Sequence, residues 1–236
     1  MDYLYNQQKY FILDHEVHIW IVSLSNKHIT QESLKRTLSY SELKKIDEFN
    51  SISERERYLY YRGILRQILS KYMELEPEKV ILSISDKGKP YIKNSELKFN
   101  ISHKNDLAVI ALGTKCEIGV DIEYLRNEID YYKIVKRFFT PEEVEKFNNF
   151  RPFYQRELFF RIWTMKEAIV KALGKDIVYY FNEFIIIFSE KDILGVEFRK
   201  ESDRLDWWYQ NKILLDDYVC SIVTTHKKTK VRYFNL

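Results

Sequence analysis

Three acidic residues and one lysine are spaced so that their side chains could act on a phosphate together with a metal ion. Asp121 and Glu123 alternate along a predicted strand, residues 119–123, so both side chains point to one face. Glu167 and Lys171 are four residues apart in a predicted helix, which also puts them on one face. Magnesium prefers such hard oxygen ligands with room left for substrate phosphates. The pattern therefore favours phosphate chemistry at a magnesium site.

Each half of this pattern also has an ordinary structural explanation. Glu167 and Lys171 have the orientation of a common helix ion pair, which contributes about 0.2–0.5 kcal/mol. An Asp-x-Glu strand is more often a solvated face than a metal site. Only the combination of the two, with the signals described below, favours a site of Asp121, Glu123 and Glu167.

Length and composition indicate a globular protein that binds a local anionic ligand. The 236 residues allow one or two domains, and 45% of them are hydrophobic. The net charge of +3 is too mild for a broad nucleic-acid groove. Cys116 and Cys220 have no metal-ligand spacing. The first six residues do not resemble a secretory signal and no apolar run could span a membrane, so we expect a cytoplasmic protein with no membrane or nucleic-acid partner.

Apolar periodicity predicts strands and helices that alternate in two groups, which indicates an α+β fold. We expect two α+β halves, residues 1–105 and 106–236, with a ligand site in the cleft between them. A hairpin is expected from the strands at 107–112 and 119–123. The other expected helices lie at 31–49, 54–73 and 155–173, with a further helix start at Thr140, and the other strands at 18–24, 80–84, 98–103, 177–188, 195–198 and 218–224.

Basic residues of the first half could meet the acidic residues of the second half in a cleft. Lys45 and Arg62 lie on predicted helices, and Lys89 follows a turn glycine where an ammonium and the backbone could both approach a phosphate. The ordinary alternatives are solvated helix surface for Lys45 and Arg62 and a plain turn residue for Lys89. We expect the cleft to bind the ligand.

Two further polar groups have competing interpretations. Ser102 and His103 are adjacent in an extended segment and point to opposite sides, so they do not form a hydrolase pair, and no nucleophile-elbow motif is present. A hydroxyl and an imidazole that bind an anion fit better, although His103 could be a structural turn residue. Glu143 stands where a capping box with Thr140 and Pro141 needs it, which favours a structural role.

Several motifs together resemble those of the 4′-phosphopantetheinyl transferases of the long, surfactin-synthetase-activating (Sfp-like) class. The resemblance covers about residues 38–175, and the joint pattern is highly specific. Its segments, in order, are GKP at 88–90, FNISH at 99–103, GVDIE at 119–123, RFFT at 137–140 and WTMKEAIVK at 163–171.

The resemblance implies a monomer of two similar α+β halves packed as a pseudo-dimer, with coenzyme A and magnesium bound in the active site between them. In the implied reaction, a serine hydroxyl of an apo acyl or peptidyl carrier protein attacks the β-phosphate of coenzyme A. The carrier keeps the phosphopantetheine arm and 3′,5′-ADP leaves. Carriers of fatty acid, polyketide and nonribosomal peptide synthesis are all compatible with the resemblance.

The resemblance also assigns roles to individual residues. It implies Asp121, Glu123 and Glu167 as metal ligands and Lys171 as the pyrophosphate-binding lysine. Either Glu123 or Glu143 would take the serine proton. The coenzyme A site would be lined by Lys89, Ser102 and His103, with Lys45 and Arg62 as candidates for the 3′-phosphate.

Two details complete the comparison with the family pattern. Lys104 stands where many relatives have a small hydroxyl residue, so phosphate contacts could differ there. Residues 124–138, with Lys133, Lys136 and Arg137, fall where relatives meet the acidic carrier helix; ordinary surface charge is the alternative.

Two other functions compete with the transferase. A metal-dependent nuclease also uses acidic ligands and lysines, but it would need a basic, aromatic-lined groove that the mild net charge argues against. A non-catalytic module that binds coenzyme A or a nucleotide would not require all three carboxylates.

Overall fold

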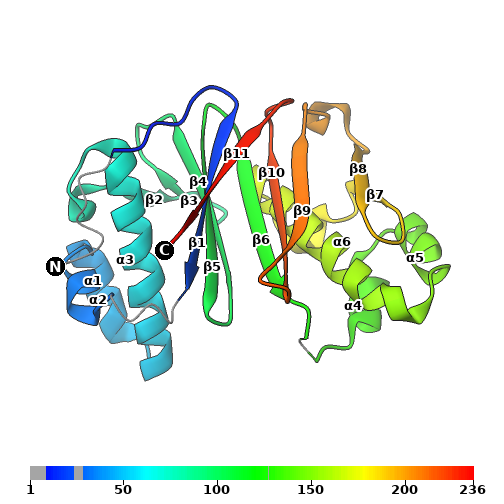
Figure 1. Cartoon of the computed structure of the whole chain (residues 1–236), viewed down its shortest axis with the longest axis horizontal. Helices are drawn as coiled ribbons and strands as arrows, with labels where there is room; N and C mark the ends of the chain where they lie inside the picture. The colour runs from blue at the N-terminus through cyan, green and yellow to red at the C-terminus, as the bar shows by residue number, and fades with distance from the viewer. Residues whose placement is uncertain (1–8, 24–28, 127) are drawn as a thin grey trace.

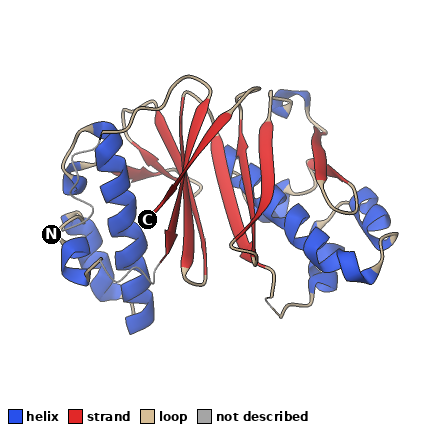
Figure 2. Cartoon of the chain, viewed as in Figure 1, coloured by secondary structure: helices blue, strands red, loops and turns tan. Residues whose placement is uncertain are grey.

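The computed structural model describes residues 9–23, 29–126 and 128–236, which stack in the order helices, sheet, sheet, helices (Figure 1). Strands fill the middle of the molecule, and the long helices cover both outer sides (Figure 2). The expected α+β class is confirmed. Two expectations concern residues outside the described part of the chain. The absence of a secretory signal was judged from the first six residues, and the first strand was expected to end at Leu24.

Groups of helices and groups of strands alternate along the chain. The helices are α1 (Gln31–Lys35), α2 (Tyr40–Glu48), α3 (Ile52–Met73), α4 (Tyr131–Phe138), α5 (Pro141–Asn148), α6 (Pro152–Leu173) and α7 (Ile177–Tyr180), with 3-10 turns at Pro77–Lys79 and Glu201–Asp203. The strands are β1 (Glu16–Ser23), β2 (Leu82–Ile84), β3 (Pro90–Ile92), β4 (Leu97–Lys104), β5 (Leu107–Thr114), β6 (Ile118–Tyr124), β7 (Phe184–Phe188), β8 (Ile193–Phe198), β9 (Trp208–Leu214), β10 (Tyr218–Thr224) and β11 (Lys230–Asn235).

The first sheet, of order β11-β1-β5-β4, is buried on both faces. Alternate residues of β5 make this plain, because Ile110 and Leu112 pack toward α3 whereas Val109 and Ala111 pack toward the second sheet. This two-sided burial explains why residues 107–112 read as one uninterrupted apolar run.

The second sheet, of order β6-β10-β9, lies between the first sheet and α6. Val120 and Ile122 of β6 join the core between the sheets. On the other side, Val219 and Val223 of β10 pack with α6 and the neighbouring helices. Asp121, between Val120 and Ile122 on β6, therefore faces α6, as the alternation predicted.

The strand pairing corrects the expected hairpin of residues 107–112 and 119–123. β5 is hydrogen-bonded to β1 on one side and to β4 on the other, so it has no free edge for β6. β6 pairs instead with β10. Local sequence spacing suggested a hairpin, but the long-range partners of β5 decide the arrangement.

Two further expectations about single elements were wrong. Residues 31–49 are not one helix, because Ser39 starts a separate helix with a capping box that includes Glu42. Residues 177–188 are not one strand, because Ile177–Tyr180 form a helical turn in which Tyr180 N donates to Asp176 O. In both places the apolar spacing suggested one continuous element. A local hydrogen bond, in a capping box or in a turn, instead gives part of the segment a different structure.

The C-terminal strand returns to the N-terminal half of the molecule. β11 runs parallel to β1, from Glu16 beside Lys230 to Ile21 beside Asn235. The first sheet thus contains β5 and β11 as well as β1 and β4, whereas β2 pairs with β3 in a separate two-stranded sheet. The division into domains at residues 105 and 106 stays a prediction. The two large sheets divide the chain at different places, between β5 and β6 and again before β11.

Gly119 lets α6 approach β6 closely. A Cβ atom on Gly119 would overlap the carbonyl oxygen of Ala168 and lie 2.8 Å from the amide nitrogen of Ala172. Both atoms belong to the α6 backbone, which cannot move aside as a side chain could. This close approach brings the helix turn of Glu167 and Lys171 against the strand of Asp121.

An ion pair between Glu143 and Lys166 lies inside the core of the second half. Lys166 Nζ is 2.9 Å from Glu143 Oε2, and both side chains are fully buried. Glu143 also forms the capping box with Thr140 and accepts a hydrogen bond from Ile186 N of β7. Burial raises the pKa of Glu143 and lowers that of Lys166, and each partner opposes the other's shift. The pair ties α5, α6 and β7 together.

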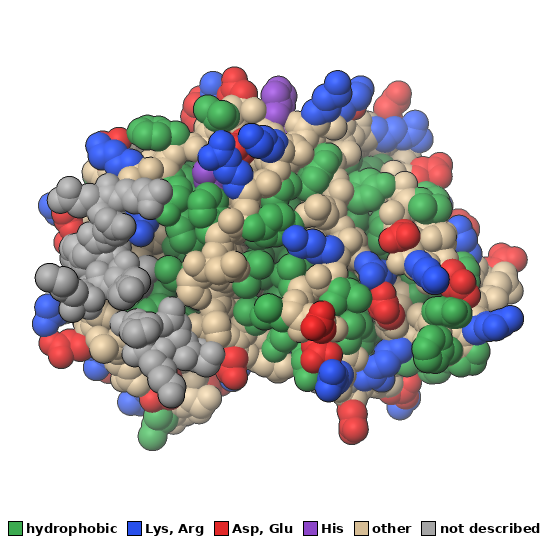
Figure 3. Space-filling view, in the orientation of Figure 1, with side chains coloured by type: hydrophobic (Ala, Val, Ile, Leu, Met, Phe, Trp, Pro, Cys, Tyr) green, Lys and Arg blue, Asp and Glu red, His purple; other side chains and the backbone are tan. Residues whose placement is uncertain are grey.

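Charges of both signs are distributed over the surface. On the face in Figure 3, basic and acidic side chains alternate and do not form one basic groove. No helix within the described residues combines the length and the apolar character needed to span a membrane. The distribution agrees with the mild net charge of the chain.

Replacing Gly119 should separate helix and strand. We expect Gly119→Ala to lower the free energy of unfolding by about 3 kcal/mol or more, because a backbone clash cannot be relieved by a rotamer change. Urea denaturation followed by circular dichroism measures this. Gly195→Ala in β8 is the matched control, since its Cβ would meet only ordinary contacts at 3.9 and 4.0 Å. Equal stability of the two variants would contradict the steric argument.

Removing the charge of Glu143 should destabilise the fold. Glu143→Gln keeps the size of the side chain but leaves Lys166 charged and unpaired, which costs about 3–5 kcal/mol in a core. The exposed Glu145 of the same helix provides the control, because Glu145→Gln should change the unfolding free energy by under about 0.5 kcal/mol. Chemical denaturation curves of both variants decide the matter, and a stable Glu143→Gln protein would refute the structural role.

Candidate functional site

The two sheets meet where side chains of β4 replace strand pairing along the edge of β6. Asn100 Oδ1 accepts a hydrogen bond of 2.9 Å from Val120 N, and Ser102 Oγ accepts one of 3.3 Å from Ile122 N. Both the acceptors and the donors are two residues apart, so they follow the same strand period. The contact aligns β4 of the first half with β6 of the second half. We call this contact the β4–β6 seam.

Asp121, Glu167 and Lys171 converge beside the seam with Ser102. Lys171 Nζ lies 2.5 Å from Asp121 Oδ1, 3.1 Å from Ser102 Oγ and 3.6 Å from Glu167 Oε2. Ser102 donates a hydrogen bond of 2.8 Å to Asp121 Oδ1. The structure thus brings together residues of β4, β6 and α6 that the sequence analysis assigned to one site.

The charged groups of this cluster shift one another's pKa values. Burial, followed by the charges of Asp121 and Glu123, raises the pKa of Glu167 to about 7. Burial alone would lower the pKa of Lys171, but Asp121 and Glu167 more than offset it, so its pKa is raised. Asp121 Oδ2 is buried and has no hydrogen-bond partner among the described residues. The cluster is therefore rich in carboxylate charge that would be stabilised by a further cation.

Glu123 lies on the same face of β6 but has a different partner. Its Oε2 atom is 2.6 Å from Lys104 Nζ, and both side chains are partly shielded from solvent. Burial raises the pKa of Glu123, and Lys104 opposes that shift. Lys104 was noted in the sequence as a departure from the family pattern, but its pairing with Glu123 was not foreseen.

The carboxylates provide a suitable donor set for a hard divalent cation, although they do not surround one point. Among the residues that the structure describes, no three His, Cys, Asp or Glu side chains are arranged to hold a metal ion. Lys171 and Lys104 pair with the carboxylates instead. The unpartnered oxygen of Asp121 and the raised pKa of Glu167 are the features that fit an additional cation.

Lys89 and Lys171 line one cavity of about 230 Å³ next to the cluster. Gly88 has a φ of +82° in the preceding turn, a conformation that glycine adopts without strain. Lys89 Nζ lies 2.5 Å from Ala172 O at the end of α6 and 3.2 Å from Glu117 Oε2. The lysine therefore has a structural partner at the helix terminus as well as a position beside the cavity.

His103 lies at a second cavity, of about 320 Å³, that shares Ile101 with the first. Its ring packs on Tyr61 with 4.4 Å between the centroids. Burial, followed by the positive charges of Arg57 and Lys171, lowers the pKa of His103, so the imidazole is neutral at pH 7. His103 and Ser102 point away from each other, as expected.

Arg57 is the residue at this cavity that the sequence analysis missed. It lines the cavity with His103 and Tyr61, and within the described residues no acidic group forms an ion pair with it. The sequence analysis named Arg62 on this helix but not Arg57. Arg57 lies four residues before Tyr61, which is one helical turn, and the contact of Tyr61 with His103 of β4 was not foreseen.

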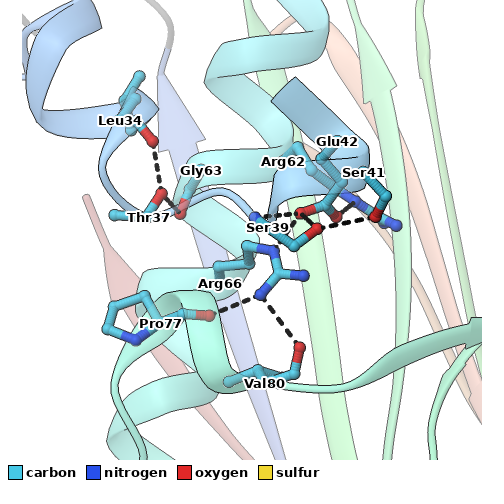
Figure 4. Close-up of polar contacts among 10 residues, drawn as sticks. All are labelled: Leu34, Thr37, Ser39, Ser41, Glu42, Arg62, Gly63, Arg66, Pro77 and Val80. Atoms are coloured by element: carbon cyan, nitrogen blue, oxygen red, sulfur yellow. Dashed lines mark hydrogen bonds and ion pairs between the residues drawn. The ribbon is translucent and has the colours of Figure 1, made fainter. Parts of the chain in front are cut away.

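Arg62 also lines the second cavity, but its guanidinium is engaged. It pairs with Glu42, which also pairs with the buried Arg66 (Figure 4). Lys45 is exposed, with Nζ 5.7 Å from the ring centre of Tyr58, another residue of the cavity wall. Both predicted basic residues thus lie near the cavity, Arg62 in its wall and Lys45 beside it.

Glu143 is the one predicted site residue whose contacts lie elsewhere. Its partners are Lys166, Thr140 and Ile186, all within the core of the second half. None of its described contacts involves Asp121.

Comparison with known proteins supplies the family. Residues 117–223 match the 4′-phosphopantetheinyl transferase superfamily model, and residues 26–115 match the model of a 4′-phosphopantetheinyl transferase N-terminal region. The 4′-phosphopantetheinyl transferase HetI of Nostoc sp. is 38% identical over 70% of this chain and 72% of its own length. The 4′-phosphopantetheinyl transferase of Bacillus subtilis is 28% identical over 71% and 74%.

A mammalian relative shares a smaller part of its length. The L-aminoadipate-semialdehyde dehydrogenase-phosphopantetheinyl transferase of Mus musculus is 29% identical over 59% of this chain and 49% of its own length. The two family models together cover β4, β5 and β6 and the cluster of Asp121, Glu167 and Lys171, whereas β1 and β11 of the first sheet lie outside the matched residues. The chain belongs to the 4′-phosphopantetheinyl transferase superfamily, and the transferase activity expected from its sequence is confirmed.

Proposed function

We propose that the protein is a long, Sfp-like transferase in which two similar halves, packed as a pseudo-dimer, bind coenzyme A at the β4–β6 seam. The observation that carries the proposal is the convergence of Asp121, Glu167 and Lys171 with Ser102 of the other half. A cluster built across two sheets suits a ligand that spans both. The expected domain division at residues 105 and 106 is kept as part of this proposal.

Coenzyme A would extend along the two cavities that share Ile101. Its diphosphate lies near Lys171 and Lys89 in the smaller cavity. Its adenosine part lies in the larger cavity, where Tyr61 and His103 offer aromatic surfaces. This placement follows from charge at one cavity and apolar walls at the other.

The 3′-phosphate would be bound at the larger cavity by Arg57. Arg57 has no ion-pair partner among the described residues, whereas the guanidinium of Arg62 is already paired with Glu42. Lys45 and Arg62 add positive potential near the cavity. A planar guanidinium also suits bidentate contact with phosphate oxygens.

Asp121, Glu123 and Glu167 would hold Mg²⁺ together with oxygens of the diphosphate. When bound, the ion would neutralise charge on the phosphate oxygens. Lys171 supplies a second positive charge next to Asp121, and it would stabilise the oxygens of the β-phosphate as the bond to the leaving group breaks.

Glu123 is the better candidate for the base that takes the proton of the carrier serine. It lies on the same strand face as Asp121, and burial raises its pKa. Glu143 is fully buried with Lys166, so it could not reach a serine without breaking the core. The serine oxygen then attacks the β-phosphate, 3′,5′-ADP leaves and the carrier keeps the phosphopantetheine arm.

The apo acyl or peptidyl carrier protein would approach near α4. This helix is basic in its last turn, with Lys136 and Arg137, and Lys133 and Tyr132 are exposed on it. Such a surface complements an acidic carrier helix. We propose that the enzyme acts as a cytoplasmic monomer.

A single assay tests the proposal against its rivals. The protein is incubated with coenzyme A, Mg²⁺ and an apo carrier protein, and the carrier is weighed by mass spectrometry. A gain of one phosphopantetheine group supports the proposal. Binding of coenzyme A without transfer would favour a non-catalytic module, and DNA cleavage without transfer would favour a nuclease.

Neutral variants of the acidic cluster should fold but transfer poorly. We expect Asp121→Asn and Glu167→Gln each to reduce kcat by about a hundredfold or more, because the transition state loses charge stabilisation. The rate of carrier modification measures the loss, and circular dichroism verifies the fold. Glu157→Gln on the same helix, which removes the pair between this half-exposed carboxylate and Arg161, should keep the normal rate. Normal rates in both cluster variants would exclude these residues from the site.

Loss of the Arg57 charge should affect recognition of the 3′-phosphate specifically. We expect Arg57→Met to weaken coenzyme A binding by about tenfold, since a charged hydrogen bond is lost, and to leave dephospho-coenzyme A binding unchanged. Titration calorimetry with both ligands provides the comparison. Arg36→Met, which removes an exposed pair with Glu32 on α1, is the control. An equal loss for both ligands would place the 3′-phosphate elsewhere.

A further inference from the structure

Lys104 and Glu123 form an ion pair that the proposed reaction does not require. Lys104 is the last residue of β4 and reaches across the β4–β6 seam to Glu123 of the second half. Their Nζ and Oε2 atoms are 2.6 Å apart, and the side chains are 27% and 21% exposed. The pair is therefore neither a solvated surface contact nor a sealed core contact. Its partial desolvation makes the interaction stronger than that of a surface pair.

The lysines of the site occupy the carboxylates that a divalent cation would need. Lys171 contacts Asp121 and Glu167, and Lys104 contacts Glu123. When all five groups are ionised, three carboxylates and two ammonium groups carry one net negative charge. The two lysines differ in position, because Lys171 belongs to α6 with Glu167 whereas Lys104 comes from the opposite half.

We infer that Lys104 is an internal counter-ion that a divalent cation must displace from Glu123, so that this lysine sets the cation concentration at which the site fills. The inference rests on the proposed function, because it takes Glu123 as a cation ligand. An ammonium 2.6 Å from a carboxylate oxygen competes directly with a cation for that oxygen. Once displaced, the flexible lysine side chain can turn toward solvent or toward an anionic substrate.

The same arrangement gives Lys104 a consequence distinct from that of Lys171. Lys171 also lines the smaller cavity, so its removal would disturb the ligand as well as the carboxylates. Lys104 has no described contact with Asp121 or Glu167. Removing its charge should therefore strengthen cation binding and not weaken it, opposite to the effect expected for most charged residues of an active site.

The test measures Mn²⁺ binding by electron paramagnetic resonance, with the full-length protein and without coenzyme A. Lys104→Met keeps the aliphatic stem and removes the charge, and Lys104→Ser is a second variant. We expect both to bind Mn²⁺ about threefold to tenfold more tightly than the original protein, because a competing cation is gone. Lys115→Met, which removes an exposed pair with Glu96, is the matched control and should leave the affinity unchanged.

A double-variant cycle shows whether the effect acts through Glu123. In a Glu123→Gln background, Lys104→Met should no longer change Mn²⁺ affinity, because the carboxylate it competes for is absent. Unchanged or weaker Mn²⁺ binding in both Lys104 variants would overturn the inference, as would a lack of Mn²⁺ binding by the original protein. Thermal unfolding of each variant shows that folded proteins are compared.

Carrier modification, measured separately, distinguishes failure of this inference from failure of the proposed function. Normal transfer by the original protein with unchanged Mn²⁺ affinity in the Lys104 variants overturns only the role of Lys104. Tighter Mn²⁺ binding in those variants with no transfer by the original protein supports the role of Lys104 and overturns the proposed function.

Discussion

The site depends on hydrogen bonds that join two sheets without strand pairing. The amide groups of Val120 and Ile122 lie on an edge of β6, where unpaired donors buried in the protein would be costly. Asn100 and Ser102 accept those bonds, and their two-residue spacing holds β4 and β6 in one register. Because Ser102 also contacts Asp121 and Lys171, the bonds that align the halves also position the charged groups.

The charged groups are balanced in a way that suits a site for both an anion and a cation. Lys171 pairs with carboxylates in this structure, yet the same ammonium lines a cavity suitable for phosphate groups. Part of the free energy of binding can therefore come from exchanging partners within the cluster. Burial, followed by the neighbouring carboxylates of Asp121 and Glu123, raises the pKa of Glu167 to about 7. Such perturbed groups are typical of functional sites.

The sequence predicted those parts of the site that depend on local periodicity. Asp121 and Glu123 share a face because strands have a period of two, and Glu167 lies by Lys171 because helices turn in 3.6 residues. The same reasoning found the capping box of Glu143. It could not show that Glu143 faces Lys166, that Lys104 meets Glu123 or that Arg57 shares a cavity with His103. These contacts join distant segments, and they follow from strand order, which the pattern within any one segment does not determine.

The return of β11 to the first sheet affects how the protein can be assembled and altered. During translation, β1 gains its antiparallel neighbour β5 long before its parallel neighbour β11 is made. Until then one edge of the sheet is open, and an open edge is prone to pair with other chains. The N-terminal half produced alone would keep that open edge permanently. Fusion partners placed directly after β11 would sit next to the end of β1, where Asn235 lies beside Ile21, on the opposite side of the molecule from α4 and α5 (Figure 1).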